Sequence, residues 1–222
     1  MKSFRNLIIL GTSHIAIESV NDVKQLIETH EPEIIALELD IFRLRKLLSN
    51  KQTKFKFRDI FSQGSVLNSL GAYIELKLGE KVGIKPGEEM KTAINLARKN
   101  KIQIALIDQP VQITFKRLSQ EITFKEKLRF VSDIITSLII PKKRIKIDLT
   151  QVPEKKLIKK IIKEVKEKYP NVYKVLIQER NLFMAQQLTE VMKLNKKVLA
   201  IVGAGHEDEL IRIVKWNLQK KK

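Results

Sequence analysis

The stretch Val198-Leu199-Ala200-Ile201-Val202-Gly203-Ala204-Gly205-His206 decides the fold of this chain. A short apolar run that is rich in β-branched residues and closes on glycine is typical of a buried parallel strand entering a tight turn. The same arrangement stands near the amino terminus, where Leu7-Ile8-Ile9-Leu10 precedes Gly11-Thr12-Ser13-His14. The sequence therefore carries Gly-x-x-His twice, each time directly after a predicted strand.

Two further apolar runs predict strands, at Glu33–Leu39 and Ile102–Ile107, in addition to Asn6–Leu10 and Val198–Val202. A helix that begins at Ser19 separates the first two strands, so they form a β-α-β unit and are parallel. Further helical patterns cover residues 40–48, 65–82, 88–99, 114–195 and 208–218. The predicted fold class is α/β: a small, mostly parallel central sheet flanked by helices, with a large helical insertion (about residues 112–195) before the last strand.

The composition indicates a folded chain of 222 residues, which we interpret as one domain over residues 1–222. No cysteine is present, so a cytoplasmic location is the simplest interpretation. We expect neither a signal peptide nor a transmembrane segment, because no apolar stretch approaches the roughly 20 residues that a membrane span needs.

The formal net charge is +18, from 43 Lys and Arg residues against 25 Asp and Glu residues. Such an excess can attract nucleic acid. The lysines are spread along helical segments, however, and aromatic residues make up only 6% of the chain. This distribution favours a solvated lysine surface over a nucleic-acid interface.

Polar side chains stand where each predicted strand ends. The carboxyl ends of parallel strands meet at one edge of a sheet, so these residues are expected to lie close together. Imidazoles mixed with carboxylates suit Zn²⁺, Mn²⁺ or Fe²⁺, and they also serve as general acids and bases. The alternative is that such residues cap helices and face water. The residues concerned are His14, Glu38, Asp40, Asp108 and His206.

Other candidates lie on predicted helices. Arg43 lies one turn after Leu39, within reach of Glu38 or of an anionic substrate. Glu179 is in line with an apolar helix face, where a charge needs a partner or a function. A structural ion pair is the alternative to a role in the site. Glu89 stands near a helix start, where the helix dipole alone favours a carboxylate. The basic segment that contains Lys116 and Arg117 could bind an anion, although it also fits an ordinary helix start.

These residues together resemble the TraB/PrgY family. The resemblance covers roughly residues 5–210 and follows the family order of motifs. The matching blocks are Gly11-Thr12-Ser13-His14, Ser19, Glu38-Leu39-Asp40 with Arg43, Pro86-Gly87-Glu88-Glu89, Asp108-Gln109-Pro110, Thr114-Phe115-Lys116-Arg117, Glu179-Arg180-Asn181 and Gly203-Ala204-Gly205-His206.

The resemblance implies a place beside the Tiki proteases, erythromycin esterases and ChaN-like proteins, which share Gly-x-x-His motifs and acidic residues in one pocket. It implies that Glu38, Arg43, Glu89, Glu179 and Arg180 join the two histidines in the site. Two departures matter: Gln109 stands where the family often has arginine, and many prokaryotic relatives continue into a hydrophobic membrane region.

Our first hypothesis is a divalent-metal-dependent hydrolase that acts on peptides. His14, His206 and Glu38 would bind Mn²⁺, Co²⁺ or Zn²⁺, and Glu89 or Glu179 would be the general base. Arg43 and Arg180 would orient carboxylates or stabilise an oxyanion, and Asp108, Lys116 and Arg117 would contact the substrate. The alternatives are a non-catalytic protein that sequesters a peptide or small ligand in the same pocket, and a basic nucleic-acid-associated protein. The sequence leaves open whether the chain forms a homo-oligomer.

Overall fold

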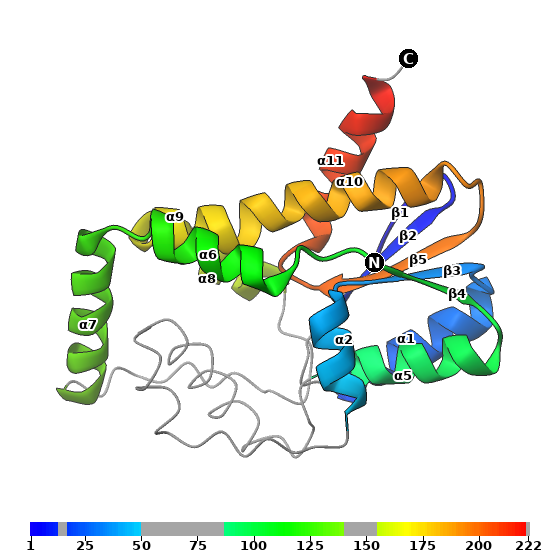
Figure 1. The fold of residues 1–222 in the computed structure, drawn as a ribbon, viewed down its shortest axis with the longest axis horizontal. Helices are drawn as coiled ribbons and strands as arrows, with labels where there is room; N and C mark the ends of the chain where they lie inside the picture. Colours follow the sequence, from blue (N-terminus) through cyan, green and yellow to red (C-terminus); the bar gives the residue numbers. More distant parts are fainter. Residues whose placement is uncertain (13–16, 50–86, 140–154, 221–222) are drawn as a thin grey trace.

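The computed structural model describes residues 1–12, 17–49, 87–139 and 155–220. Within them the chain forms a three-layer α/β/α arrangement, with one sheet between two layers of helices (Figure 1). The helix predicted over residues 65–82 lies outside the described residues, as does His14.

The sheet has five strands in the order β1-β2-β5-β3-β4. The four strands predicted from sequence are confirmed and run parallel, while β1 pairs antiparallel with β2 at one edge. The last strand of the chain is therefore the central one. The bounds are Lys2–Phe4 for β1, Leu7–Thr12 for β2, Ile34–Leu37 for β3, Gln103–Leu106 for β4 and Val198–Gly203 for β5.

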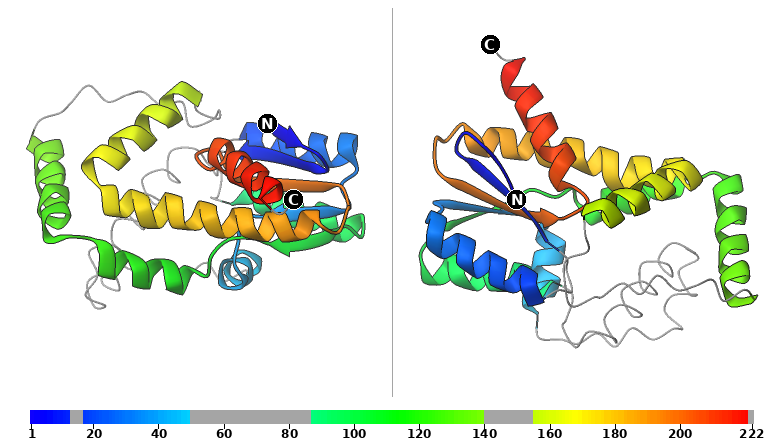
Figure 2. Two further views of the ribbon diagram at one scale, coloured as in Figure 1. Left: turned by 90° about the horizontal axis from the view of Figure 1, so that it is seen from above. Right: turned by 180° about the vertical axis from the view of Figure 1, so that it is seen from behind.

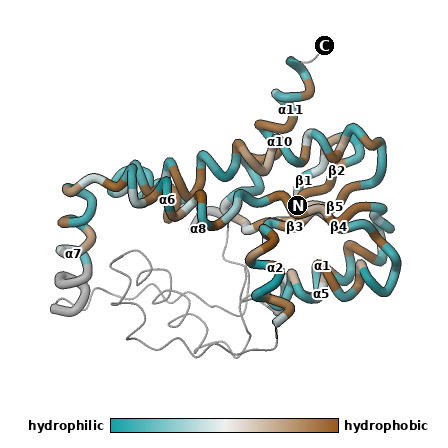
Figure 3. Tube along the Cα trace, viewed as in Figure 1, coloured by the Kyte–Doolittle hydropathy of each residue, from teal (hydrophilic) through white to brown (hydrophobic). Residues whose placement is uncertain are grey.

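Alternate residues of the strands belong to two separate apolar cores, as a pleated sheet buried on both faces requires. On β5, for example, Ala200 and Val202 face one core while Leu199 and Ile201 face the other. Helices α10 (Arg180–Met192) and α11 (Glu207–Gln219) cover the first face. Helices α1 (Ile17–His30) and α5 (Glu88–Lys99) cover the second face (Figures 1 and 2). The interior strands β2, β5 and β3 are correspondingly rich in hydrophobic residues (Figure 3), and the buried residues of these helices are mostly apolar.

The predicted helical insertion before the last strand is confirmed over residues 111–139 and 155–192, and residues 140–154 of its predicted range lie outside the described residues. The insertion projects to one side of the sheet, and the carboxyl-terminal half of its last helix, α10, lies over the sheet (Figure 1). The elements of the insertion are α6 (Val111–Glu121), α7 (Phe124–Ile139), α8 (Lys155–Lys168), α9 (Pro170–Tyr173), the π-helix η1 (Lys174–Glu179) and α10.

Outside the insertion, the short helix α2 (Ile41–Leu48) follows β3.

The structure differs from the sequence-based expectation at three places. Strand β1 was not predicted; it folds onto β2 through a two-residue turn in which Arg5 has a φ of 52°. Strands β2 and β3 are parallel as expected, but β5 lies between them. Helix α1 starts at Ile17, so Ser19 lies buried in its first turn rather than before it.

No helix among the described residues is long and apolar enough to cross a membrane.

Candidate functional site

The two Gly-x-x-His motifs begin side by side at the carboxyl edge of the sheet. In the pairing of β2 with β5, Gly11 lies opposite Val202 and Thr12 lies opposite Gly203. The turn after β5 packs directly on Gly11: a Cβ atom at this position would lie 2.9 Å from Glu207 Oε2 and 3.0 Å from the Cα of Ala204. The absence of a side chain at Gly11 is therefore what allows the two motifs to approach each other.

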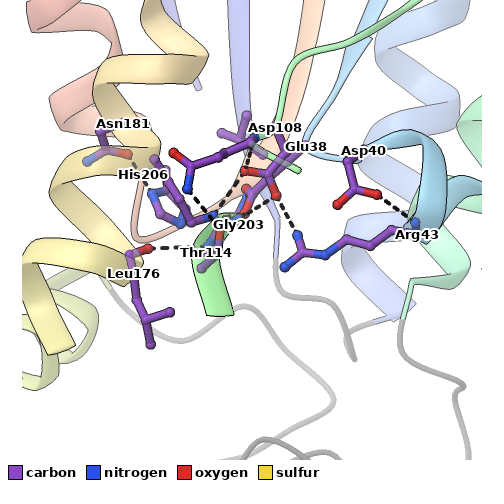
Figure 4. Close-up of polar contacts among 12 residues, drawn as sticks. Glu38, Asp40, Arg43, Asp108, Thr114, Leu176, Asn181, Gly203 and His206 are labelled. Carbon is purple, nitrogen blue, oxygen red and sulfur yellow. Dashed lines mark hydrogen bonds and ion pairs between the residues drawn. The ribbon is translucent and has the colours of Figure 1, made fainter. Parts of the chain in front are cut away.

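His206 is buried and held by a side chain from α10. Its Nδ1 lies 2.6 Å from Oδ1 of Asn181, and the Nδ2 of Asn181 donates to Oε2 of Glu209 at 3.2 Å. The other ring nitrogen, Nε2, lies 3.5 Å from Oε1 of Glu38. The imidazole is thus fixed between an amide and a carboxylate (Figure 4).

Glu38 directly follows β3, and it connects three elements. Its Oε2 accepts a hydrogen bond of 2.6 Å from the backbone N–H of Gly203, at the end of β5. Its Oε1 accepts from Nη2 of Arg180, at the start of α10. Glu38 is only 6% exposed, so a charge at this position requires such partners.

Arg180 is the central cation of the site. Its Nε and Nη2 donate to the two oxygens of Asp108 at 3.0 and 2.8 Å, in addition to the bond to Glu38. Burial alone would lower the pKa of the Arg180 guanidinium, but the charge of Glu38 and the hydrogen bonds to Asp108 raise its pKa above the ordinary value. The side chain therefore stays charged and holds two carboxylates from neighbouring strand ends in place.

Arg43 binds the same carboxylate as Arg180 does. Its Nη1 pairs with Oδ2 of Asp108, and its side chain remains 35% exposed. Asp40 places it, because its Oδ1 caps α2 by accepting from the backbone N–H of Arg43 at 2.8 Å. The Oδ2 of Asp40 accepts from the N–H of Val111 at 2.8 Å, which fixes the start of α6 as well.

Gln109 lies beside Asp108, at the position where family members often have arginine. Its backbone N–H donates to Oδ1 of Asp108 at 2.8 Å, and its side chain donates to the hydroxyl of Thr114 at 3.1 Å. Both side chains are buried. In this chain Gln109 therefore supports the loop between β4 and α6 through one hydrogen bond to a carboxylate and one to a hydroxyl.

Glu179 and Arg117 form a second group. Arg117 binds both oxygens of Glu179, at 3.1 and 2.7 Å, and also Glu121 at 2.8 Å. The hydrogen bond to Glu179 is the main reason why the pKa of Arg117 is raised. This pairing joins α6 to η1. It is a structural ion pair of the kind that the sequence analysis gave as the alternative role of Glu179. Lys116, on the same helix as Arg117, is exposed.

Glu89 is buried in the first turn of α5, only 1% exposed. Helix α5 leads into β4, so this turn lies at the sheet edge where the parallel strands end. Gly87, which precedes the helix, has a φ of 86°, a conformation that favours glycine.

The comparison with known proteins agrees with these motifs. The model of the TraB/PrgY/gumN family matches residues 2–207. The chain belongs to the TraB/PrgY/gumN family.

Two relatives show how widely this family is found. An uncharacterized protein of Methanocaldococcus jannaschii is 36% identical over 218 residues, which are 95% of this chain and 53% of the relative. The human TraB domain-containing protein is 23% identical over 233 residues, which are 89% of this chain and 60% of the relative. The chain thus spans between 53% and 60% of the length of these TraB relatives.

Within the part of this TraB-family chain that the structure describes, the site unites residues from three strand ends and two helices. Its contacts connect Glu38, Arg43, Asp108, Arg180 and His206, all of them predicted from sequence. Asn181, Glu209 and the N–H of Gly203 were not predicted to take part. Asn181 directly follows Arg180, but only the packing of α10 on α11 reveals its contacts with His206 and Glu209.

The described residues, which exclude His14, contain no group of three or more His, Cys, Asp or Glu side chains that could hold a metal ion. They do bring together two side chains of the predicted metal set, His206 and Glu38. The third member, His14, would come from the motif that begins beside Gly203.

Proposed function

We propose that this chain is a hydrolase that cleaves peptides with the help of a divalent metal ion held by His206, Glu38 and His14. The observation that carries the proposal is the position of His206 Nε2, 3.5 Å from Glu38 Oε1, on a ring whose Nδ1 is engaged by Asn181. Metal-binding histidines are commonly held in this way through their second nitrogen.

The contact between His206 and Glu38 fits a shared cation. In a neutral ring whose proton is on Nδ1, Nε2 is an acceptor and faces a second acceptor, the carboxylate oxygen. Such a pair is favourable only with a proton or a cation between the two atoms. His206 Nε2 and Glu38 Oε1, which lie 3.5 Å apart, would be two of the atoms that hold the ion. When bound, the ion would supply an activated water and polarise a carbonyl.

The arginines of the site have separate roles in this proposal. Arg180 is buried and holds Glu38 and Asp108 in fixed orientations, so it positions the acidic residues. Arg43 is partly exposed and pairs with Asp108 through one nitrogen. Its partial exposure suits it to stabilise negative charge on the substrate or on an oxyanion.

Of the two glutamates expected to act as general base, Glu179 is bound through both oxygens by Arg117. We assign the general base to Glu89 because the first turn of α5, in which it lies, is at the same edge of the sheet as the site. Lys116 and Arg117 would lie farther along the substrate, on α6.

The choice of a peptide as substrate follows from the resemblance of the Gly-x-x-His and acidic motifs to the Tiki proteases, which are regarded as metal-dependent. The names of these relatives state no activity. We place the activity in the cytoplasm, because a chain without cysteine needs no oxidising compartment.

Metal content and peptide hydrolysis, measured on the same preparations, test the proposal. The purified protein should bind Mn²⁺, Co²⁺ or Zn²⁺ and cleave members of a mixed peptide library. His206→Ala and Glu38→Gln should lose the metal and lower hydrolysis by about 100-fold or more, since even second-shell changes cost 10–100-fold. His30→Ala is the matched control, because His30 ends α1 and takes no part in these contacts. The proposal would be overturned if the purified protein contained no metal and the variants hydrolysed peptides as the wild type does. Tight peptide binding without cleavage would instead support a sequestering protein.

A further inference from the structure

We propose that Glu209 and Asn181 form a positioning chain that fixes the proton of His206 on Nδ1 and thereby directs Nε2 toward Glu38. The inference deepens the proposed function and rests on it for its purpose. The state of the ring can nevertheless be measured without any activity.

The orientation of the Asn181 amide is the first step. An amide has a donor end and an acceptor end, and its neighbours decide which end points where. The Nδ2 of Asn181 lies 3.2 Å from Oε2 of Glu209, and an ionised carboxylate can only accept. The carbonyl oxygen of Asn181 must therefore point the other way, toward His206.

The tautomer of His206 is the second step. The Oδ1 of Asn181 lies 2.6 Å from Nδ1 of the ring, and an amide carbonyl oxygen can only accept. The ring must donate from Nδ1, which leaves Nε2 as its basic nitrogen. Asn181 is fully buried and His206 is 6% exposed, so water competes little for these hydrogen bonds.

The third step is the anchoring of the chain in the fold. Glu209 is in the first turn of α11, and its Oε1 is bound by Arg212 at 3.0 Å one turn later. Arg180 and Asn181 come directly after the π-helix η1, and π-helical turns are often found at functional sites. Arg180 binds Glu38. Two consecutive residues of α10 thus hold the two members of the His206–Glu38 pair.

Nitrogen NMR of histidine side chains tests the positioning chain directly. In protein labelled with ¹⁵N-histidine, long-range ¹H–¹⁵N correlations at pH 8 distinguish a ring protonated at Nδ1 from one protonated at Nε2. His206→Gln and His30→Gln identify the signals. We expect the wild-type His206 ring to carry its proton on Nδ1, both with bound metal and after treatment with a chelator.

Three variants separate positioning from stability. Asn181→Ala should release the ring to a mixture with a large Nε2-protonated share, and it should lower hydrolysis by about 10–100-fold. Glu209→Ala should act in the same direction, whereas Glu209→Gln should retain the wild-type ring, because a glutamine oxygen can still accept from Asn181. Asn217→Ala is the matched control: it removes another amide hydrogen bond from α11 to α10, the one to Thr189 at 3.3 Å, and should leave the His206 ring unchanged.

A wild-type ring protonated at Nε2, or at both nitrogens at pH 8, would overturn the inference without any variant. So would retention of the Nδ1 proton in folded Asn181→Ala and Glu209→Ala. If the ring behaves as expected but the protein neither binds metal nor cleaves peptides, the positioning chain stands and the proposed hydrolase function fails.

Discussion

At the scale of single residues, two glycines of the repeated motif serve different purposes. A side chain at Gly11 would meet the backbone of the turn after β5, 3.0 Å from the Cα of Ala204, and also the carboxylate of Glu207 at 2.9 Å. Among the residues that the structure describes, a side chain at Gly205 would meet the Cδ1 of Ile162, at 3.3 Å, and no backbone atom. The end of a flexible side chain can move by a few tenths of an ångström, whereas packed backbone cannot do so cheaply.

We therefore expect Gly11→Ala to lower the free energy of unfolding by about 1–3 kcal/mol, as overpacking of a tight site does. Gly205→Ala should cost about 1 kcal/mol or less, because Ile162 can adjust. Urea denaturation of both variants measures the difference. Equal losses would show that the close approach of the two motifs is not what requires glycine at position 11.

The candidate site was largely predictable at this scale, because the ends of parallel strands share one edge. Glu38, Asp108 and His206 follow strands that the apolar runs predict, and the structure brings them together around Arg180. The hydrogen bonds of Asn181 were not predictable. They depend on how α10 lies against α11, and hydrophobic periodicity gives the face of each helix but not its neighbour.

At the scale of elements, hydrogen bonds of the buried Glu126 side chain connect two helices of the insertion, α7 and α9. Glu126, at the start of α7, accepts from the N–H of Thr123 at 3.0 Å. It also accepts from the N–H and the side chain of Asn171 on α9, at 2.9 and 3.0 Å. A helical pattern predicted these segments from sequence. It could not reveal the π-helix that follows α9, because the six residues Lys174–Glu179 are too few for a hydrophobic period to distinguish a π-helix from an α-helix.

Burial alone would raise the pKa of Glu126, but its hydrogen bonds to Asn171 and Thr123 lower the pKa below the ordinary value. A carboxyl group whose pKa is lower in the folded state stabilises the fold above its unfolded pKa of about 4.3. This stabilisation is lost as the pH falls through the folded pKa. We expect Glu126→Gln to lower the free energy of unfolding at pH 7 by about 1–3 kcal/mol and to weaken its decline below about pH 4.3.

Urea denaturation at several pH values between 7 and 3 measures this effect. Glu167→Gln is the control, because Glu167 is an exposed residue of α8 that pairs with Lys163 at 3.8 Å. An exposed pair of this kind contributes little. The proposed role of the Glu126 hydrogen bonds is wrong if the free energies of unfolding of Glu126→Gln and Glu167→Gln depend on pH in the same way.

At the scale of the whole molecule, the fold depends on its last strand. β2 hydrogen-bonds to one side of β5, and β3 hydrogen-bonds to the other side. The two strands from the amino-terminal part of the chain are therefore connected in the sheet through residues 198–203. The sequence predicted the four parallel strands and the faces that they bury. It did not predict the order of the strands, because an apolar run that is buried on both faces fits any interior position of a parallel sheet.

This topology predicts an unequal response to truncation at the two ends. A chain that stops at Asn195 loses β5 and α11, so β2 and β3 have no common neighbour and the apolar core under α10 is exposed. We expect this chain to show no cooperative unfolding in urea and no sharp thermal transition. A chain that begins at Arg5 loses only β1, which pairs with β2 at the sheet edge, and it should keep a cooperative transition at a lower urea concentration. Circular dichroism during urea titration of both chains is the measurement, and a cooperative transition in the chain that stops at Asn195 would contradict a fold completed by its last strand.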